Sequence, residues 1–353
     1  MAIVTPKQAA LLVKQTFESG LIPFLKGSPG CGKSQIMHKF FRENNLKLID
    51  HRISGSVPED FSGLPDLSGE KARFIPFDIF PLKSDPIPEG YDGWGLFLDE
   101  YNSGSTETMA ATYKLLLDRM VNQTPLHDNV AIGLAGNLET DKAIVNYLSS
   151  AIRSRVVTIQ MKSHYPDWLE VVGLPYNYDP RIISYLENNP DGLNNFGSDP
   201  DAESYACERT WEFMNNHMKT HIHPNMKAEQ VDSFTNLLGC TIGDPTARSF
   251  IAFIRNYADL VPLKEILRDP EEASIPSDHS LKWHTITNLA LYVEESNFEK
   301  AITYALRYPL NFQVIFFKSV MQRLPALHKH PAFRKGAIKI NQYLNQSEFT
   351  FDD

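Results

Sequence analysis

The chain has 353 residues, 42% hydrophobic and 22% charged, which is typical of a globular protein with more than one compact unit. Its formal net charge of −9 disfavours nucleic acid and anionic membranes as general partners, and no apolar run reaches the roughly 18 residues that a membrane-spanning helix needs. The N-terminus lacks a secretory signal pattern, and three widely spaced cysteines (Cys31, Cys207 and Cys240) favour a reducing compartment, so we expect a cytoplasmic protein.

The first part of the chain alternates strands and helices. A helix is predicted over residues 6–19, capped by Thr5 and ended by Gly20, and a strand follows over 21–25. Helices are also predicted from residue 35 and over 106–117. Further strands are predicted over residues 47–52, 94–99, 130–135 and 155–160, with a turn at 67–70 between two short arms. This order predicts an α/β fold: a parallel sheet of five strands, covered by helices on both faces.

After residue 161 the pattern becomes helical. We predict helices over residues 166–172, 181–188, 210–220, 226–238 and 246–260, and helical structure over 280–344. Residues 189–201 have the composition of a loop, and residues 268–278 that of an acidic linker. The chain is therefore predicted to have three domains: an α/β core over 1–164, a helical domain over 165–265 and a helical C-terminal extension over 266–353.

Residues 27–34 read G-S-P-G-C-G-K-S, a match to the G-x-x-x-x-G-K-[ST] phosphate-binding loop between a strand and a helix. Successive backbone amides in such a loop form an anion site, and the helix N-terminus adds partial positive charge. Lys33 is placed to reach the β- and γ-phosphates, and the Ser34 hydroxyl to bind Mg²⁺. The motif predicts that ATP is held by Gly27, Ser28, Pro29, Gly30, Cys31, Gly32, Lys33 and Ser34.

Two acids, Asp99 and Glu100, end the predicted strand 94–99. Taken alone, this pattern also suits an ordinary strand followed by a solvated acidic turn. A parallel sheet, however, binds ligands at the carboxyl ends of its strands, and the phosphate loop follows another of these strands. We therefore interpret Asp99 as a ligand of Mg²⁺ and Glu100 as the general base that polarises the attacking water.

Four further polar residues are candidates for the same site, each with a structural alternative. Asn137, after strand 130–135, can orient water near the γ-phosphate or serve as a turn residue. Arg153 and Arg155 can reach the γ-phosphate of a neighbouring subunit or form surface ion pairs. Arg209 can fold back onto the phosphates or form an ion pair at the start of its helix.

With these motifs in order, the chain resembles the AAA+ ATPases, and most closely the MoxR-type branch found in bacterial and phage genomes. Two pieces carry the closer resemblance. One is R-I-S-G-S-V-P-E-D-F-S-G-L-P at 52–65, followed by a hairpin insertion, and the other is R-T-W-E at 209–212 together with G-D-P-T-A-R-S-F at 243–250. The resemblance implies that Asn137 is the sensor-1 residue, that Arg209 is the sensor-2 residue and that the helical domain is a lid. It implies Arg155 as the arginine finger, with Arg153 as second choice, although the family often has Asp-Arg-Phe where this chain has Ser-Arg-Val.

The resemblance also implies a function. ATP would be hydrolysed between the subunits of a homo-oligomeric ring, usually a hexamer, to remodel a protein partner, often one with a von Willebrand factor A domain. Two alternatives are a nucleic-acid-associated motor, for which Lys71 and Arg73 would supply charge, and a nucleotide-gated scaffold with slow hydrolysis. The acidic composition disfavours the first and Glu100 the second. A phage origin would place the protein in the host cytoplasm.

Overall fold

The computed structural model describes residues 3–141, 145–197, 202–223, 226, 228–257, 261–277 and 279–337. The chain forms two compact units. The first combines the residues up to Trp168 with Asp191–Thr210, and the second combines Leu169–Pro190 with the residues from Trp211 on. A segment of the predicted helical domain therefore belongs to the α/β unit, whereas the division of the chain into three domains stays a prediction.

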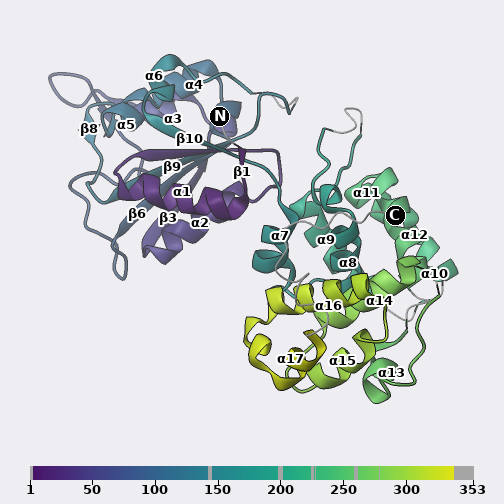
Figure 1. Cartoon of the computed structure of the whole chain (residues 1–353). Coiled ribbons are helices and arrows are strands. Elements are labelled where there is room, and N and C mark those ends of the chain that lie inside the picture. The colour runs from purple at the N-terminus through teal and green to yellow at the C-terminus, as the bar shows by residue number, and fades with distance from the viewer. Residues whose placement is uncertain are drawn as a thin grey trace. The chain divides into compact units, whose positions relative to one another are not determined.

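A parallel sheet of six strands organises the first unit, in the order β1-β10-β2-β9-β6-β3 (Figure 1). The strands are β1 (Ile3–Val4), β2 (Ile22–Lys26), β3 (Leu46–Arg52), β6 (Gly93–Asp99), β9 (Val130–Gly136) and β10 (Val156–Met161). The predicted α/β fold class is confirmed. The sequence predicted five of these strands and missed β1, because a two-residue strand is too short to show a period; β1 pairs with the end of β10.

Helices cover both faces of this sheet (Figure 1). One face carries α1 (Pro6–Glu18) and α2 (Lys33–Glu43), and the other carries α3 (Pro58–Ser62), α4 (Thr106–Ala111), α5 (Tyr113–Leu117) and α6 (Ser150–Arg153). Each face of the sheet has its own hydrophobic core, because successive side chains of β6 point to opposite faces. Leu96 and Leu98 pack with α3–α6, and Phe97 packs with α1 and α2. Gly95 lies under Phe41 of α2, whose ring a Cβ would approach to 2.4 Å.

Local hydrogen bonds fix the ends of these helices. Thr5 caps α1 with a capping box: its hydroxyl accepts the Gln8 N–H at 3.5 Å, and the side-chain oxygen of Gln8 accepts the Thr5 N–H at 3.0 Å. The single helix predicted over 106–117 is instead two short helices. At their junction the Thr112 hydroxyl donates to the Met109 carbonyl at 2.8 Å and also contacts the Tyr101 hydroxyl, a tertiary partner that the sequence pattern does not reveal.

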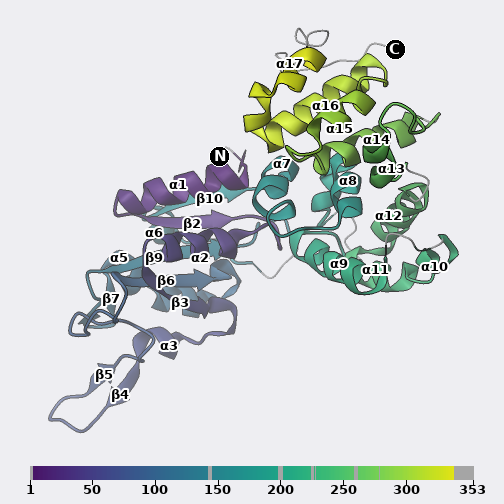
Figure 2. The same cartoon turned by 90° about the horizontal axis from the view of Figure 1, so that it is seen from below.

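Two antiparallel hairpins complete the first unit. The predicted turn at 67–70 joins β4 (Leu64–Asp66) and β5 (Arg73–Ile75), and this hairpin extends away from the sheet (Figure 2). The second hairpin, β7 (Met120–Val121) and β8 (Thr124–Pro125), was not predicted because its strands have two residues each. Two 3₁₀ turns, η1 (Ile53–Gly55) and η2 (Tyr101–Ser103), follow β3 and β6 and adjoin the candidate site. The short helix α7 (Tyr165–Trp168) closes the first stretch of this unit.

The second unit is helical in its described residues. It begins with a π-helical turn, η3 (Leu169–Gly173), and α8 (Pro180–Asn188) follows before the chain passes through η4 (Pro190–Leu193). The helix α9 (Glu208–His221) begins in the first unit and enters the second at Trp211. The remaining helices are α10 (Ala228–Asp232), α11 (Thr235–Ile242), α12 (Asp244–Tyr257), α13 (Leu263–Arg268), α14 (His279–Leu291), α15 (Phe298–Ala305), α16 (Leu310–Arg323), η5 (Pro325–Lys329) and α17 (Pro331–Ala337). Large buried aromatic residues such as Phe298, Phe312 and Phe316 form the core of α13–α17.

Several predictions for this unit need correction or fall outside the described residues. The helix predicted over 226–238 is broken into α10 and α11, and α13 was not predicted. Of the predicted linker, residue 268 belongs to α13, and residues 269–277 contain neither helix nor strand but include Ala273, which is buried in the core of this unit, so the role of a linker stays a prediction. Residue 278 lies outside the described residues, as do residues 198–201, 258–260 and 338–344 of other predicted segments. Across the described residues, no helix has the length and hydropathy that crossing a membrane requires.

Candidate nucleotide-binding site

The predicted site residues converge at one edge of the sheet. β2 lies between β10 and β9, and β9 lies next to β6, all parallel. The residues that follow β2, β9 and β6 therefore meet at the carboxyl ends of these strands. They are the phosphate loop, Asn137 and the pair Asp99 and Glu100.

The phosphate loop needs its glycines. Gly30 and Gly32 have φ angles of 78° and 86°, in the left-handed region that other residues avoid. Gly27 is packed so closely that a Cβ would lie 2.9 Å from the Met161 carbonyl oxygen. Gly32 is also the N-cap of α2, so no side chain occupies the amides of the first turn, and the loop fits a phosphate group.

Lys33 is buried beneath this loop, with 8% of its surface exposed. Its Nζ donates to the carbonyl oxygens of Gly27 at 2.7 Å and Ser28 at 3.0 Å, and to Oδ1 of Asn137 at 3.2 Å. The structure thus brings the side chains of Lys33 and Asn137 into contact, close enough for both to bind the same phosphate group. The ammonium can exchange these neutral acceptors for anionic phosphate oxygens, which form stronger hydrogen bonds.

The two predicted magnesium ligands are in direct contact. The Ser34 hydroxyl donates to Oδ2 of Asp99 at 2.8 Å, while Oδ1 of Asp99 accepts the N–H of Glu100 at 2.8 Å. A hydroxyl and a carboxylate are oxygen donors of the kind that Mg²⁺ prefers, so these residues fit that ion. When bound, Mg²⁺ would neutralise charge on the β- and γ-phosphates.

Glu100 has an unusual backbone conformation and an unpredicted partner. Its φ angle is 51°, which is uncommon for a residue with a side chain and marks a constrained site. Oε2 of Glu100 accepts a hydrogen bond from the Ser54 hydroxyl. Ser54 reaches it because Arg52, two residues earlier, pairs with Asp99 in the sheet. The sequence offers no local signal for this contact, which depends on the β3–β6 register.

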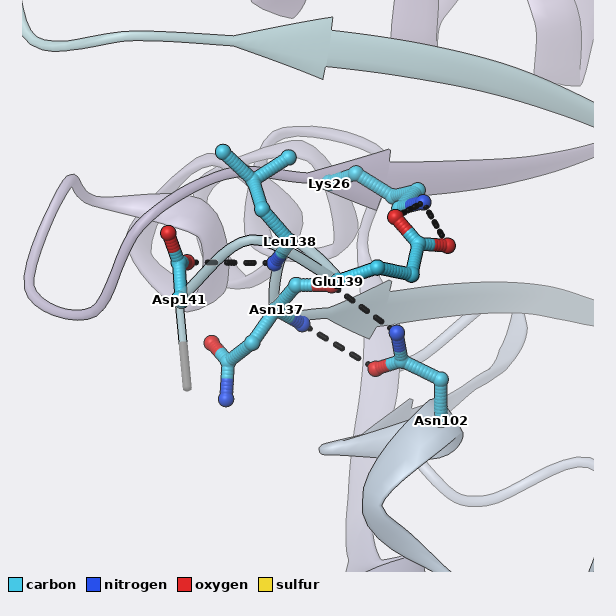
Figure 3. Close-up of polar contacts among 6 residues, drawn as sticks. All are labelled: Lys26, Asn102, Asn137, Leu138, Glu139 and Asp141. Carbon is cyan, nitrogen blue, oxygen red and sulfur yellow. Dashed lines mark hydrogen bonds and ion pairs between the residues drawn. The ribbon is translucent and has the colours of Figure 1, made fainter. Parts of the chain in front are cut away.

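The loop after β9 is tied to its surroundings at several points (Figure 3). The backbone of Asn137 pairs with the side chain of Asn102, and Glu139 forms an ion pair with Lys26 at the end of β2. Asp141 accepts the Leu138 N–H at 3.1 Å and the Ser28 hydroxyl at 3.3 Å. Burial raises the pKa of Asp141, although these hydrogen bonds and the Lys33 charge oppose the shift.

The segment 191–210 brings further groups to the phosphate loop. Nδ2 of Asn194 donates to the Pro29 carbonyl at 3.3 Å and to Oε2 of Glu208 at 3.1 Å. Burial raises the pKa of Glu208, and a Cβ on Gly30 would lie 2.5 Å from Sγ of Cys207. Arg209 is exposed at the start of α9, and its Cβ would lie 3.9 Å from a Cβ added to Gly30. The structure therefore places Arg209 beside the phosphate loop.

Arg153 and Arg155 lie at the opposite edge of the sheet. Both are exposed, and Nη1 of Arg155 donates to Oγ of Ser154 at 2.9 Å. Arg155 directly precedes β10, whose first residue pairs with Ile22, whereas the phosphate loop follows Lys26. Arg155 is thus level with Leu21, six residue steps before Gly27, which corresponds to about 20 Å along the strands. The structure does not bring either arginine to the phosphate loop of its own chain.

No protein-family model matches the chain, and no curated protein matches it. Among solved structures, the RuvB Holliday junction branch migration motor of Thermotoga maritima is 12% identical, with a TM-score of 0.37 over 75% of this chain and 74% of that one. A mutant of that protein is 14% identical, with a TM-score of 0.34 over 76% and 77%. These TM-scores are too low to support an argument about this chain.

Proposed function

We propose that the chain is a magnesium-dependent ATPase of the AAA+ class, related to the MoxR branch, that works as a ring of identical subunits. One observation supports the chemistry above all. Lys33 contacts Asn137, and Ser34 contacts Asp99, so the groups for phosphate, water and metal meet at one sheet edge. Glu100, beside Asp99, is the general base in this proposal.

The position of Arg155 supports a ring. An arginine about 20 Å along the strands from its own loop can serve a phosphate only in a neighbouring subunit. Such an arginine stabilises the charge that develops in the transition state, and head-to-tail contacts close into rings when the rotation permits. We place Arg155 in that role, with Arg153 as the second candidate, and propose six subunits on the family resemblance.

The β4–β5 hairpin favours a protein partner over nucleic acid. Its side chains Leu67 and Phe74 are 76% and 48% exposed, which suits an apolar contact. Nε of Arg73, a candidate phosphate contact, lies 2.8 Å from Oδ2 of Asp66 and is engaged within the hairpin. We therefore propose remodelling of a protein partner in the cytoplasm, and a protein with a von Willebrand factor A domain is the partner that the family resemblance suggests.

The chemical proposal is tested by measuring phosphate release and nucleotide binding in parallel. Lys33→Ala should abolish ATP binding in calorimetry, because the buried ammonium is lost. Glu100→Gln should bind ATP but turn over at least about a hundredfold more slowly, the low end for loss of a general base. Lys39→Ala, on the exposed side of α2, is the matched control and should behave as wild type. A wild-type protein that releases no phosphate would refute the proposal.

The assembly is tested by particle mass with and without ATP. We expect ATP and Mg²⁺ to favour a closed ring, because each site would need an arginine from the next subunit. A chain that stays monomeric while hydrolysing ATP would retain the chemistry and exclude the ring. DNA or RNA that co-purifies with the ring and stimulates turnover would instead favour the nucleic-acid motor.

A further inference from the structure

We infer that Asn102 is a positioning residue that holds Asn137 in register with Glu100. This inference rests on the proposed ATPase function and adds a residue that the sequence motifs do not contain. Asn102 lies two residues after Glu100 in η2 and is 1% exposed. It therefore belongs to the same short segment as the proposed base, and its side chain faces the loop after β9 (Figure 3).

Asn102 binds both backbone groups of Asn137. Its Oδ1 accepts the Asn137 N–H at 3.0 Å, and its Nδ2 donates to the Asn137 carbonyl at 2.8 Å. The last β6–β9 pair in the sheet is Leu98 with Leu134, so regular pairing has ended before Asn137. The carboxamide replaces the missing strand partner and satisfies a donor and an acceptor that would otherwise lie unpaired next to the site.

The backbone of Asn102 is itself fixed. Its carbonyl accepts the Asn146 N–H at 2.7 Å. The preceding side chain, Tyr101, is fully buried, and its hydroxyl contacts that of Thr112 at 2.8 Å. A short, rigid path therefore connects Glu100 to Asn137 through the Asn102 side chain. The Asn137 side chain remains free of this pair and contacts Lys33, toward the phosphate position.

Gly136 leaves room for the Asn102 carboxamide. A Cβ at this position would lie 2.3 Å from Oδ1 of Asn102 and 2.9 Å from the ring of Phe24. An added methyl group would therefore displace the carboxamide from the Asn137 backbone. A displacement of about 1 Å between groups that act on the same water can lower a rate by on the order of a hundredfold. The contact between Asn102 and the Asn137 backbone therefore also requires glycine at position 136.

The first experiment separates turnover from nucleotide binding. Asn102→Asp keeps the acceptor for the Asn137 N–H but places an oxygen against the Asn137 carbonyl, and Asn102→Ala removes both bonds. We expect kcat to fall by about tenfold to a hundredfold, with ATP affinity within about threefold of wild type because Lys33 and Ser34 keep their own partners. An unchanged kcat, or parallel losses of kcat, affinity and thermal stability, would overturn the inference.

A matched control exists at the other end of the same two strands. Nδ2 of Asn129 donates to the Asp92 carbonyl at 2.9 Å and so links the amino ends of β9 and β6. Asn129→Ala removes a carboxamide bridge of the same kind, far from the site. It should leave kcat unchanged, and a loss equal to that of Asn102→Ala would show that any bridge between these strands has the same effect.

A double-mutant cycle tests the pair directly. Gly136→Ala should lower kcat strongly in the wild-type background and much less in the Asn102→Ala background, where no carboxamide remains to be displaced. Equal losses in both backgrounds would overturn the inference, because the glycine would then act independently of Asn102.

Hydrogen exchange gives a readout that does not require hydrolysis. With Mg²⁺ and a non-hydrolysable ATP analogue bound, the amide of Asn137 should exchange at least about tenfold faster in Asn102→Ala than in wild type, because its acceptor is lost. Unchanged exchange would overturn the positioning role. A wild-type protein that binds the analogue but releases no phosphate would refute the ATPase proposal, and the exchange result would still decide whether Asn102 holds Asn137.

Discussion

The hydroxyl of Ser54 donates a hydrogen bond to Oε2 of Glu100, joining the ends of two neighbouring strands at the proposed catalytic base. To accept a proton from water, the carboxylate must give up or share this bond. Hydrogen bonds to charged groups contribute roughly 1.5–3 kcal/mol. Ser54→Ala should therefore raise the basal turnover of ATP by about tenfold or more, the low end of this range, without changing ATP affinity.

Phosphate release and calorimetry on Ser54→Ala and Ser54→Thr measure this effect. The threonine variant retains the hydroxyl and serves as the control, with turnover near that of wild type. A fall in turnover for Ser54→Ala would show instead that Ser54 holds Glu100 in its working position.

Arg155→Ala should slow ATP hydrolysis at least about a hundredfold and leave ATP binding intact, since fingers of this kind contribute about 10³–10⁵ in rate. Arg153→Ala should have a smaller effect. Arg42→Ala, which removes another exposed arginine from the first unit, is the control. Because Arg155 would act on the next subunit, mixing Arg155→Ala with Lys33→Ala should restore part of the activity. In a mixed ring, some sites combine the intact phosphate loop of an Arg155→Ala subunit with the intact Arg155 of a Lys33→Ala subunit. Mixed rings that never exceed the activity of either variant alone would exclude the action of Arg155 on a neighbour.

Lys26→Met should destabilise the first unit by about 1–3 kcal/mol, because it leaves the partly buried carboxylate of Glu139 without its cation. Burial alone would raise the pKa of Glu139, but the hydrogen bond and charge of Lys26 bring it below its usual value. The pair therefore stabilises the fold above the unfolded-state pKa, and its contribution is lost as the pH falls through the folded-state pKa.

Denaturant unfolding of Lys26→Met and wild type at several pH values measures this difference, which should be largest near neutral pH and shrink in acid. Lys39→Met, in an exposed pair with Glu43 at 3.8 Å, should cost less than about 0.5 kcal/mol. A difference between Lys26→Met and wild type that is independent of pH would assign the loss to packing of the lysine chain.

The hairpin turn should hold Asp66 ionised in strong acid. Hydrogen bonds from Ser68 and Arg73 lower the pKa of Asp66 to about 2. A carbon NMR titration of this carboxyl should have its midpoint there, and Arg73→Ala should move the midpoint upward, toward the unperturbed value of about 3.9. The turn is thus stabilised above the unfolded-state pKa and loses this support as the pH falls toward 2.

Lys71→Ala, in the same turn, provides the control for this titration and should leave the midpoint in place. A wild-type midpoint near the unperturbed value would contradict the hydrogen-bonded turn.

Elements with a strong local pattern were predictable. The helix α1 follows from Thr5, Pro6 and Gly20, and the strands around the phosphate loop follow from their apolar runs. Elements fixed by partners far away in the sequence were not. The two-residue strand β1 exists because β10 pairs with it, and the break between α4 and α5 occurs where Thr112 meets Tyr101.

The same division holds at the candidate site. The sequence by itself determined which residues can hold a triphosphate and a metal, because the loop at 27–34 and the acids at 99 and 100 are local patterns whose chemistry is inherent in their side chains and spacing. Only the tertiary structure decided which residues support them. Ser54 contacts Glu100, and Asn102 contacts Asn137, because β3, β6 and β9 are neighbours in one register. Arg155 is far from the phosphate loop of its own chain because it precedes β10, which runs parallel to β2, whereas the loop follows β2. Strand order and register arise from packing the whole sheet, and no local stretch of sequence encodes them.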